Sequence, residues 1–80
     1  MIELEVLTPR GLEYKGEAEY LILPTLSGEI SVLPQHIPLI SVLKPGRMRI
    51  KTKTEEILKE IEGGILEVAE NKMTILLKKF

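Results

Sequence analysis

The residues that could do chemistry are few and lie far apart in the sequence. His36 is the only histidine, and the chain contains no cysteine and no aspartate. A nucleophilic triad could be built only from His36, a glutamate and one of three serines, Ser27, Ser31 or Ser41. The Gly-x-Ser-x-Gly turn that exposes such a serine in many hydrolases is missing. We therefore predict that the chain has no catalytic residue and is not an enzyme.

The sequence also offers little to a metal ion or a nucleotide. Zinc takes three or four nitrogen, sulfur or oxygen ligands, and one histidine with scattered glutamates is a poor set. Neither Gly-x-Gly-x-x-Gly nor the phosphate-binding Gly-rich loop with Lys-Ser/Thr occurs. Glu55 and Glu56 are adjacent carboxylates, but neighbouring residues of a strand face opposite sides. We predict no metal and no cofactor.

Lys72 leaves one alternative function open. Biotin and lipoate carriers are small all-β domains that expose a lysine on a hairpin, and Asn71-Lys72-Met73 would lie at the tip of the last predicted hairpin. Those carriers surround the lysine with a tighter signature than Lys-Met, and a shared fold class does not imply a shared function. A carrier domain modified at Lys72 is kept as the alternative.

Charge and composition exclude several classes of partner. The net charge is −1 and the pI is about 5.8, whereas nucleic acid or anionic lipid would favour a strongly basic face. No apolar run approaches the roughly 20 residues that span a bilayer, and the start lacks a signal-peptide core. We expect a cytoplasmic protein. All 12 acidic residues are glutamate, which indicates a thermophilic source, with codon bias as the alternative.

The elements that must position these residues are short strands. The 80 residues suffice for one domain, residues 1–80, and frequent Gly and Pro turn signals favour an all-β fold. We predict a two-sheet β-sandwich of about nine to ten short, mostly antiparallel strands. A core this small has a thin stability margin, and without cysteine no disulfide can add to it. Docking onto a larger partner could add to its stability.

Local patterns give the expected boundaries of the first strands. Residues 2–6 alternate apolar and acidic side chains, as in a half-buried strand. Residues 12–15 form a short strand that ends in a tight turn at Lys15-Gly16. Residues 17–23 form the next, which Pro24 should stop because proline donates no hydrogen bond to a sheet.

The second half contains one ambiguous segment. Lys44-Pro45-Gly46-Arg47 suits a type II turn, with Gly46 at the position that needs positive φ. Residues 54–64 favour a helix of one or two turns by their local signals, but a strand with Ile57 and Ile61 on one face also fits. Residues 65–77 form a closing hairpin around Glu70-Asn71-Lys72, where asparagine tolerates the left-handed conformation.

Two segments contain long motifs. Ser27–Leu39 runs Gly-Glu, an apolar stretch and then Pro-Gln-His-Ile-Pro, and Gly63–Val68 is followed by Asn71 and an alternating strand. Both closely resemble hallmarks of the ATP synthase epsilon subunit family. Leu43–Gly46 and the basic strand after it are similar to the family as well, as are the opening strands. The resemblance covers essentially the whole chain, in order.

The chain departs from the family at a few positions. Ser31 and Gln35 stand where the family usually has small residues or glycine, so we expect a less free loop backbone there. The sequence stops at Phe80, directly after the last strand, whereas family members carry a further helical hairpin associated with ATP sensing and inhibition of hydrolysis. We therefore expect the hairpin and its regulatory roles to be absent from this chain.

The resemblance implies a non-catalytic rotor subunit of the central stalk. Such a subunit links the gamma subunit to the membrane c ring and couples proton-driven rotation to ATP synthesis. It would lie at the cytoplasmic face of the bacterial inner membrane, held there through the complex without direct insertion.

The resemblance also assigns contact residues. Ser27, Gly28, Glu29 and His36 would face the c ring, with Glu29 paired to a ring arginine and His36 hydrogen-bonded nearby. A face of the sandwich would pack on the gamma subunit, with Thr8 and Ser41 as its edge members.

Overall fold

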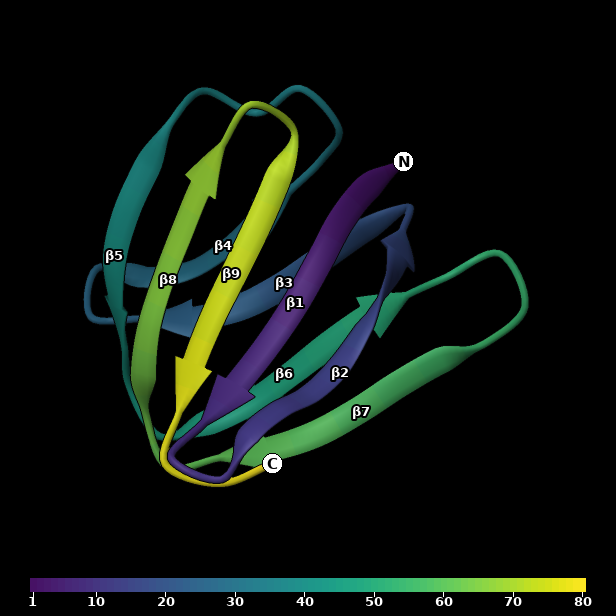
Figure 1. Cartoon of the computed structure of the whole chain (residues 1–80). Coiled ribbons are helices and arrows are strands. Elements are labelled where there is room, and N and C mark those ends of the chain that lie inside the picture. Colours follow the sequence, from purple (N-terminus) through teal and green to yellow (C-terminus); the bar gives the residue numbers. More distant parts are fainter.

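The computed structural model describes residues 1–80 and contains nine β-strands and no helix (Figure 1). No helix is therefore present that could span a membrane. The all-β prediction is confirmed. The strands are β1 (Ile2–Thr8), β2 (Gly11–Ala18), β3 (Tyr20–Thr25), β4 (Gly28–Val32), β5 (Leu39–Leu43), β6 (Gly46–Lys51), β7 (Glu56–Ile61), β8 (Gly64–Ala69) and β9 (Lys72–Leu77).

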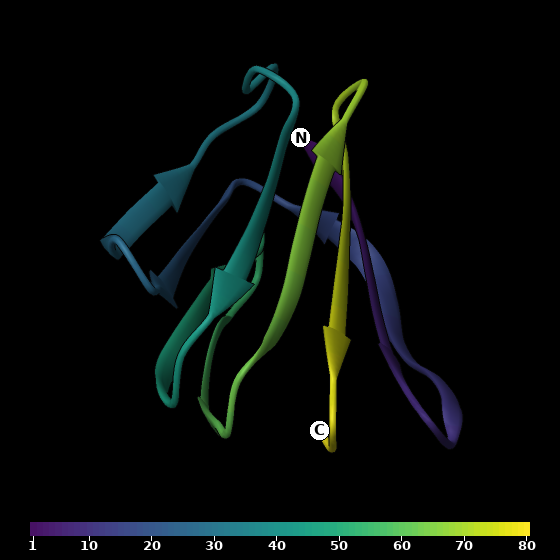
Figure 2. The ribbon, with the colours of Figure 1, turned by 90° about the vertical axis from the view of Figure 1, so that its left-hand side faces the viewer.

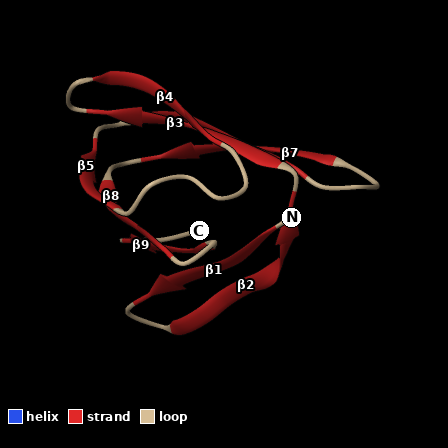
Figure 3. Cartoon of the chain, turned by 90° about the horizontal axis from the view of Figure 1, so that it is seen from above, coloured by secondary structure: helices blue, strands red, loops and turns tan.

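The strands form one hydrogen-bonded sheet that curls into two facing layers. The order is β2-β1-β9-β8-β5-β3-β6-β7, with β4 paired to β3. Seen from above, β3, β4 and β7 lie opposite β1, β2 and β9, and β5 and β8 close one side (Figure 3). A single register pair, Thr25 with Leu43, joins the layers at this corner. All pairs are antiparallel except β1 with β9, which is parallel.

The core lies between the two layers and follows the period-two pattern. In β1, Ile2, Leu4 and Val6 are buried while Glu3 is exposed, as the alternation predicts. The buried apolar residues form one cluster, to which all nine strands contribute. Its members are Ile2, Leu4, Val6, Ala18, Leu21, Leu23, Val32, Leu43, Met48, Ile50, Ile61, Leu66, Val68, Met73, Ile75 and Leu77.

The tight turn predicted at Lys15-Gly16 is wrong. β2 continues through it, and Gly16 pairs with Leu4. The pairing of β1 with β2 has a register shift between Val6 and Leu7, so that Val6 pairs with Tyr14 and Leu7 with Leu12. A bulge of this kind bends the strand without ending it, which short-range patterns do not reveal.

Two predictions about proline and glycine are also wrong. Pro24 lies inside β3, because pairing with β6 ends at Ile22 and resumes with β5 only at Thr25, so no N–H is needed at Pro24. Its carbonyl accepts a hydrogen bond from the Lys44 nitrogen at 2.9 Å. Gly46 begins β6 without positive φ, so the type II turn predicted there does not form.

The ambiguous segment is a strand, and the local preference for a helix is wrong. β7 pairs with all of β6, from Gly46 with Ile61 to Lys51 with Glu56. Thr52, not Thr54, organises the preceding loop, because its hydroxyl accepts hydrogen bonds from the nitrogens of Thr54 and Glu55. A helix of one or two turns is only marginally stable by itself, so pairing with β6 decides that this segment is a strand.

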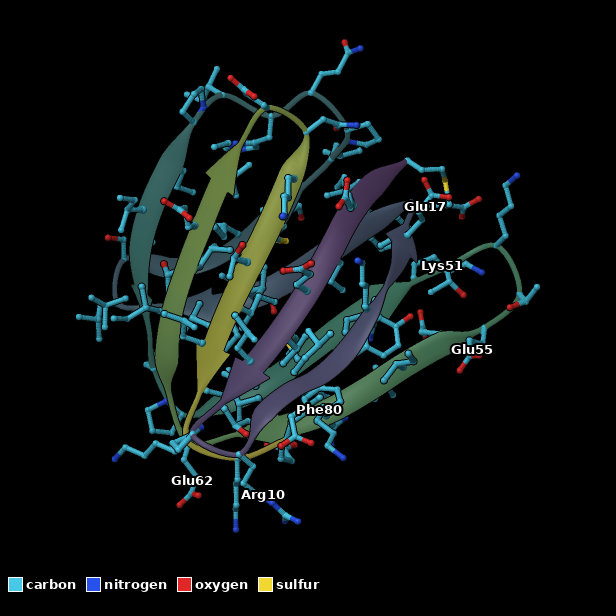
Figure 4. All side chains as sticks on the ribbon, in the orientation of Figure 1. Arg10, Glu17, Lys51, Glu55, Glu62 and Phe80 are labelled. Carbon is cyan, nitrogen blue, oxygen red and sulfur yellow. The ribbon has the colours of Figure 1, made fainter.

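The open side of the sandwich, between β2 and β7, is covered by the end of the chain. Phe80 reaches this side from below (Figure 4). Its ring centroid is 6.4 Å from that of Tyr14 on β2, and the ammonium of Lys59 on β7 is 4.9 Å from its centre. Aromatic and cation–π contacts thus join the two edge strands.

Candidate functional site

The outer face of one layer carries a continuous row of apolar side chains. This layer is β5, β8, β9, β1 and β2, nearest the viewer in Figure 1. Cross-strand pairs place Val42 beside Ile65, Ile65 beside Leu76, Leu76 beside Leu7, and Leu7 beside Leu12. These five residues, called the apolar row below, all lie on the solvent side. The four apart from half-buried Leu7 are exposed.

Apart from Ile40, which lies on β5 beside Glu67, the rest of this face is polar. One register row above the apolar row, Glu67, Thr74, Glu5 and Lys15 lie side by side. The Glu5 carboxylate lies 3.9 Å from the ammonium groups of both Lys15 and Lys72. The apolar surface therefore occupies one end of the face and is bounded by charge, an arrangement typical of partner-binding patches.

The outer face of the opposite layer is charged and internally paired. Arg47 on β6 contacts Glu60 on β7 at 3.0 Å, and Arg49 contacts Glu56 at 3.8 Å. A shallow hollow of about 130 Å³ lies here, lined by Ile22, Glu29, Arg47 and Arg49. Because the arginines already have carboxylate partners, this face needs no further anion. We call it the charged face.

The residues assigned to the c ring lie at the two ends of β4. Ser27 lies in the turn before β4, Gly28 and Glu29 are the first two residues of the strand, and His36 lies in the loop after it. The Thr25 hydroxyl donates to the Gly28 carbonyl at 2.6 Å and accepts from the Ser27 nitrogen at 3.2 Å, which fixes the turn. Gly28 has a φ of 118°, which other residues rarely adopt.

Residues 33–38 form the other loop, next to the β8–β9 turn and the N-terminus (Figure 2). The Nδ1 of His36 lies 2.7 Å from the Ile37 carbonyl oxygen. A carbonyl only accepts, so this contact requires a proton on Nδ1, and the tautomer that provides it has Nε2 as its acceptor. Figures 1 and 2 both separate this loop from the β3–β4 turn, so the assigned residues form two tips, not one cluster.

The residues assigned to the gamma contact occupy different environments. Thr8 ends β1, where its hydroxyl donates to the Glu13 carboxylate at 2.6 Å and accepts from the Arg10 nitrogen. Ser41 is half-buried on the inward side of β5, and its neighbours Ile40 and Val42 point outward. Both assignments remain predictions. On β5, the exposed apolar side chains are those of Ile40 and Val42, the neighbours of Ser41.

Lys72 does not lie at a hairpin tip. Glu70 and Asn71, with φ of 52° and 60°, form the turn, and Lys72 is the first residue of β9, paired with Ala69. The arrangement does not favour the carrier alternative. No group of three or more His, Cys, Asp or Glu side chains is placed to hold a metal. Every buried side-chain nitrogen or oxygen has a hydrogen-bond partner.

Sequence reasoning missed the apolar row and three apolar side chains at the tips. Leu26, next to Ser27, is 69% exposed, and Leu33 and Ile37 flank His36 at 57% and 74%. The tips are therefore apolar as well as polar. The available signal was the presence of leucine and isoleucine within turns whose other residues are proline, glycine, serine, glutamine and histidine.

Residues 1–80 match the family described as "ATP synthase, Delta/Epsilon chain, beta-sandwich domain". Proteins named ATP synthase epsilon chain are similar: 40% identity over 77 residues in Chromobacterium violaceum, 37% over 78 in Neisseria meningitidis serogroup C and 43% over 74 in Brevibacillus brevis. These matches cover 94%, 95% and 91% of this chain but 55%, 56% and 56% of the relatives.

Two solved structures share the fold. The chain superposes on part of the Euglena gracilis mitochondrial ATP synthase, OSCP/F1/c-ring, with a TM-score of 0.89 at 22% identity, covering 98% of this chain and 51% of that one. For the Tetrahymena thermophila mitochondrial ATP synthase, central stalk/c-ring, the TM-score is 0.81 at 18% identity, covering 95% of this chain and 62% of that one. With a family match over its whole length and this shared fold, the chain belongs to the ATP synthase delta/epsilon β-sandwich family.

Proposed function

We propose that this domain is a non-catalytic part of the central stalk of an F-type ATP synthase, linking the gamma subunit to the c ring. The observation that carries the proposal is the apolar row, bounded by charge on one outer face. The names of the relatives, ATP synthase epsilon chain, support the same role. The chain spans little more than half the length of those relatives, so the proposal concerns this domain alone.

The apolar row is proposed as the gamma-binding surface. Covering contiguous exposed apolar side chains yields roughly 25 cal/mol per Å² of area removed from water. The row is more than scattered exposure, because each member is paired with the next across neighbouring strands. Thr8, at the end of β1 next to Leu7, would lie at the rim of that interface.

The two tips at the ends of β4 are proposed as the c-ring contact. Glu29 is exposed and forms no ion pair within the chain, so its carboxylate is free for a basic group of the ring. Charged contacts at a rim fix orientation more than affinity. His36 offers Nε2 as an acceptor for an amide or basic side chain.

The construction of the domain suits the transmission of torque. A close-packed core has low compressibility, so a force applied at the tips reaches the apolar row with little deformation. The role requires two docking surfaces and no active site. We place the domain at the cytoplasmic face of a bacterial membrane, peripheral and held through its partners.

The gamma contact is tested with matched substitutions on the two outer faces. Ile65 in the row and Leu58 on the charged face are 46% and 47% exposed. We expect Ile65→Lys to lower co-purification with tagged gamma subunit at least about 100-fold, because an unpaired charge would be buried. Leu58→Lys should leave it unchanged. Equal losses, or none, would overturn the gamma assignment, with circular dichroism confirming that both variants are folded.

The ring contact is tested by reversing one charge. We expect Glu29→Lys to weaken binding to immobilised c ring in low salt by about fivefold, the range of an exposed ion pair. Glu55→Lys changes the net charge equally, from an exposed loop at another part of the surface, and serves as the control. Unchanged binding of the Glu29 variant would remove Glu29 from the contact.

A further inference from the structure

One asparagine connects three separate segments of the chain at the top of the molecule. The side-chain oxygen of Asn71 accepts a hydrogen bond from the Gln35 nitrogen at 2.8 Å. Its side-chain nitrogen donates to the Met1 carbonyl at 2.6 Å. Its own carbonyl accepts from the Glu3 nitrogen at 3.1 Å. The β8–β9 turn, the N-terminus and the loop after β4 thus meet at this residue, and Figure 2 shows them together.

The loop of residues 33–38 has no other hydrogen-bonded connection to the fold. Within the loop, the His36 nitrogen bonds to the Leu33 carbonyl at 3.2 Å, and the His36 ring bonds to Ile37. Pro34 and Pro38 supply no N–H. The bond from Gln35 to Asn71 is the only one that joins the loop to another segment.

We infer that Asn71 is a positioning residue, which holds the loop so that the acceptor Nε2 of His36 faces the docking partner. Gln35, one residue before the histidine, has a φ of 63°, which is strained for a residue other than glycine. The hydrogen bond from its nitrogen to the Asn71 side chain stabilises this conformation. Loss of the bond would release Gln35 and let His36 sample other orientations. The inference rests on the proposed ring contact of His36.

Asparagine is the residue type that meets all the requirements at this position. Its φ of 60° lies in the left-handed region, which asparagine tolerates better than most residues. Its amide accepts from one segment and donates to another at the same time. Aspartate could accept from Gln35 but could not donate to Met1, and glycine could supply only the backbone conformation.

The test compares two glycine substitutions in the same turn. Asn71→Gly and Glu70→Gly both remove a side chain at positive φ, but the Glu70 side chain makes no hydrogen bond or ion pair. On the whole 80-residue chain, amide exchange at Gln35 should become about tenfold faster in Asn71→Gly and stay unchanged in Glu70→Gly. Asn71→Asp keeps the acceptor and should restore most of the protection.

Binding to isolated c ring is measured on the same variants, with His36→Ala alongside. We expect Asn71→Gly and His36→Ala to lower the affinity by a similar factor, about threefold to tenfold, and Glu70→Gly to have no effect. Unchanged Gln35 exchange in Asn71→Gly would overturn the inference whatever the ring affinity. Faster exchange with unchanged affinity would overturn it too if His36→Ala weakens binding. If His36→Ala also binds normally, the proposed ring contact itself fails.

Discussion

The outer face of β5, β8, β9, β1 and β2 carries the apolar row, whereas the outer face of β6 and β7 pairs arginines with glutamates. Ile65 and Leu58 make the comparison direct, because their exposed fractions are nearly equal at 46% and 47%. Ile65 has Val42 and Leu76 as its cross-strand neighbours. Leu58 has Arg49.

The difference indicates that continuity, and not exposure alone, distinguishes a candidate docking surface. A single exposed leucine among charges is normal on a soluble protein. Apolar side chains in register across five strands are not, because each adds to one patch that a partner can cover. On the charged face, cross-strand pairs satisfy the charges within the chain.

The largest expected effect comes from breaking the layer under the apolar row. A methyl group added at Gly64 would lie 2.2 Å from the Leu76 carbonyl oxygen, a backbone atom that cannot move freely. We expect Gly64→Ala to lower the free energy of unfolding by about 3 kcal/mol, measured by urea denaturation. Gly46→Ala, on β6, meets only the Pro24 ring at 3.1 Å and should cost less. A larger loss at Gly46 would contradict the packing described.

Truncation within the row should reveal its centre. Leu76 lies in the middle strand of the five, and Leu12 lies on the edge strand. We expect Leu76→Ala to weaken gamma binding by about 2 kcal/mol and Leu12→Ala by less than about 0.5 kcal/mol, because binding energy concentrates at the centre of an interface. Titration calorimetry with purified gamma subunit measures both. The reverse order would move the contact towards β2.

Phe80 should matter for stability and not for the gamma contact. Its ring contacts Tyr14 and Lys59 across the open side, away from the outer faces. We expect Phe80→Ala to lower the free energy of unfolding by about 1 kcal/mol, with gamma affinity unchanged. Phe80→Leu keeps apolar bulk and should recover part of the loss. A change in gamma affinity would show that the open side takes part in docking.

The smallest effect is expected on the charged face. Arg47 and Glu60 are both largely exposed, so their ion pair is screened by water and salt. A double-mutant cycle of Arg47→Ala and Glu60→Ala should give a coupling below about 0.5 kcal/mol, falling further in high salt. Gamma binding should not change in either variant. A clear loss would give the charged face a partner and remove the contrast.

Local patterns in the sequence predicted part of this fold. The alternation in β1 and the left-handed Asn71 were visible because they depend on neighbouring residues. Pro24 within β3 and the strand at residues 56–61 were not, because both follow from pairing with distant strands. Where the local preference was weak, as in residues 54–62, the neighbouring strand decided.

The candidate site divides in the same way. The resemblance assigned the proposed ring contact to the tips at the ends of β4 through a continuous motif, Ser27–Leu39. The apolar row has no such motif, because the parallel pairing of β1 with β9 sets Leu7 beside Leu76, and a bulge sets Leu12 beside Leu7. Register between strands far apart in sequence decides which side chains become neighbours, and no single segment encodes it.

The central claim, that the apolar row meets the gamma subunit, can be tested most directly by chemical protection. The chain has no cysteine, so a single introduced thiol reports on one position. Maleimide labelling of Ile65→Cys and Leu58→Cys is timed with and without gamma subunit. The account predicts that gamma slows labelling at position 65 at least about tenfold and leaves position 58 unchanged. Protection at 58, or equal labelling of 65 in both states, would contradict it.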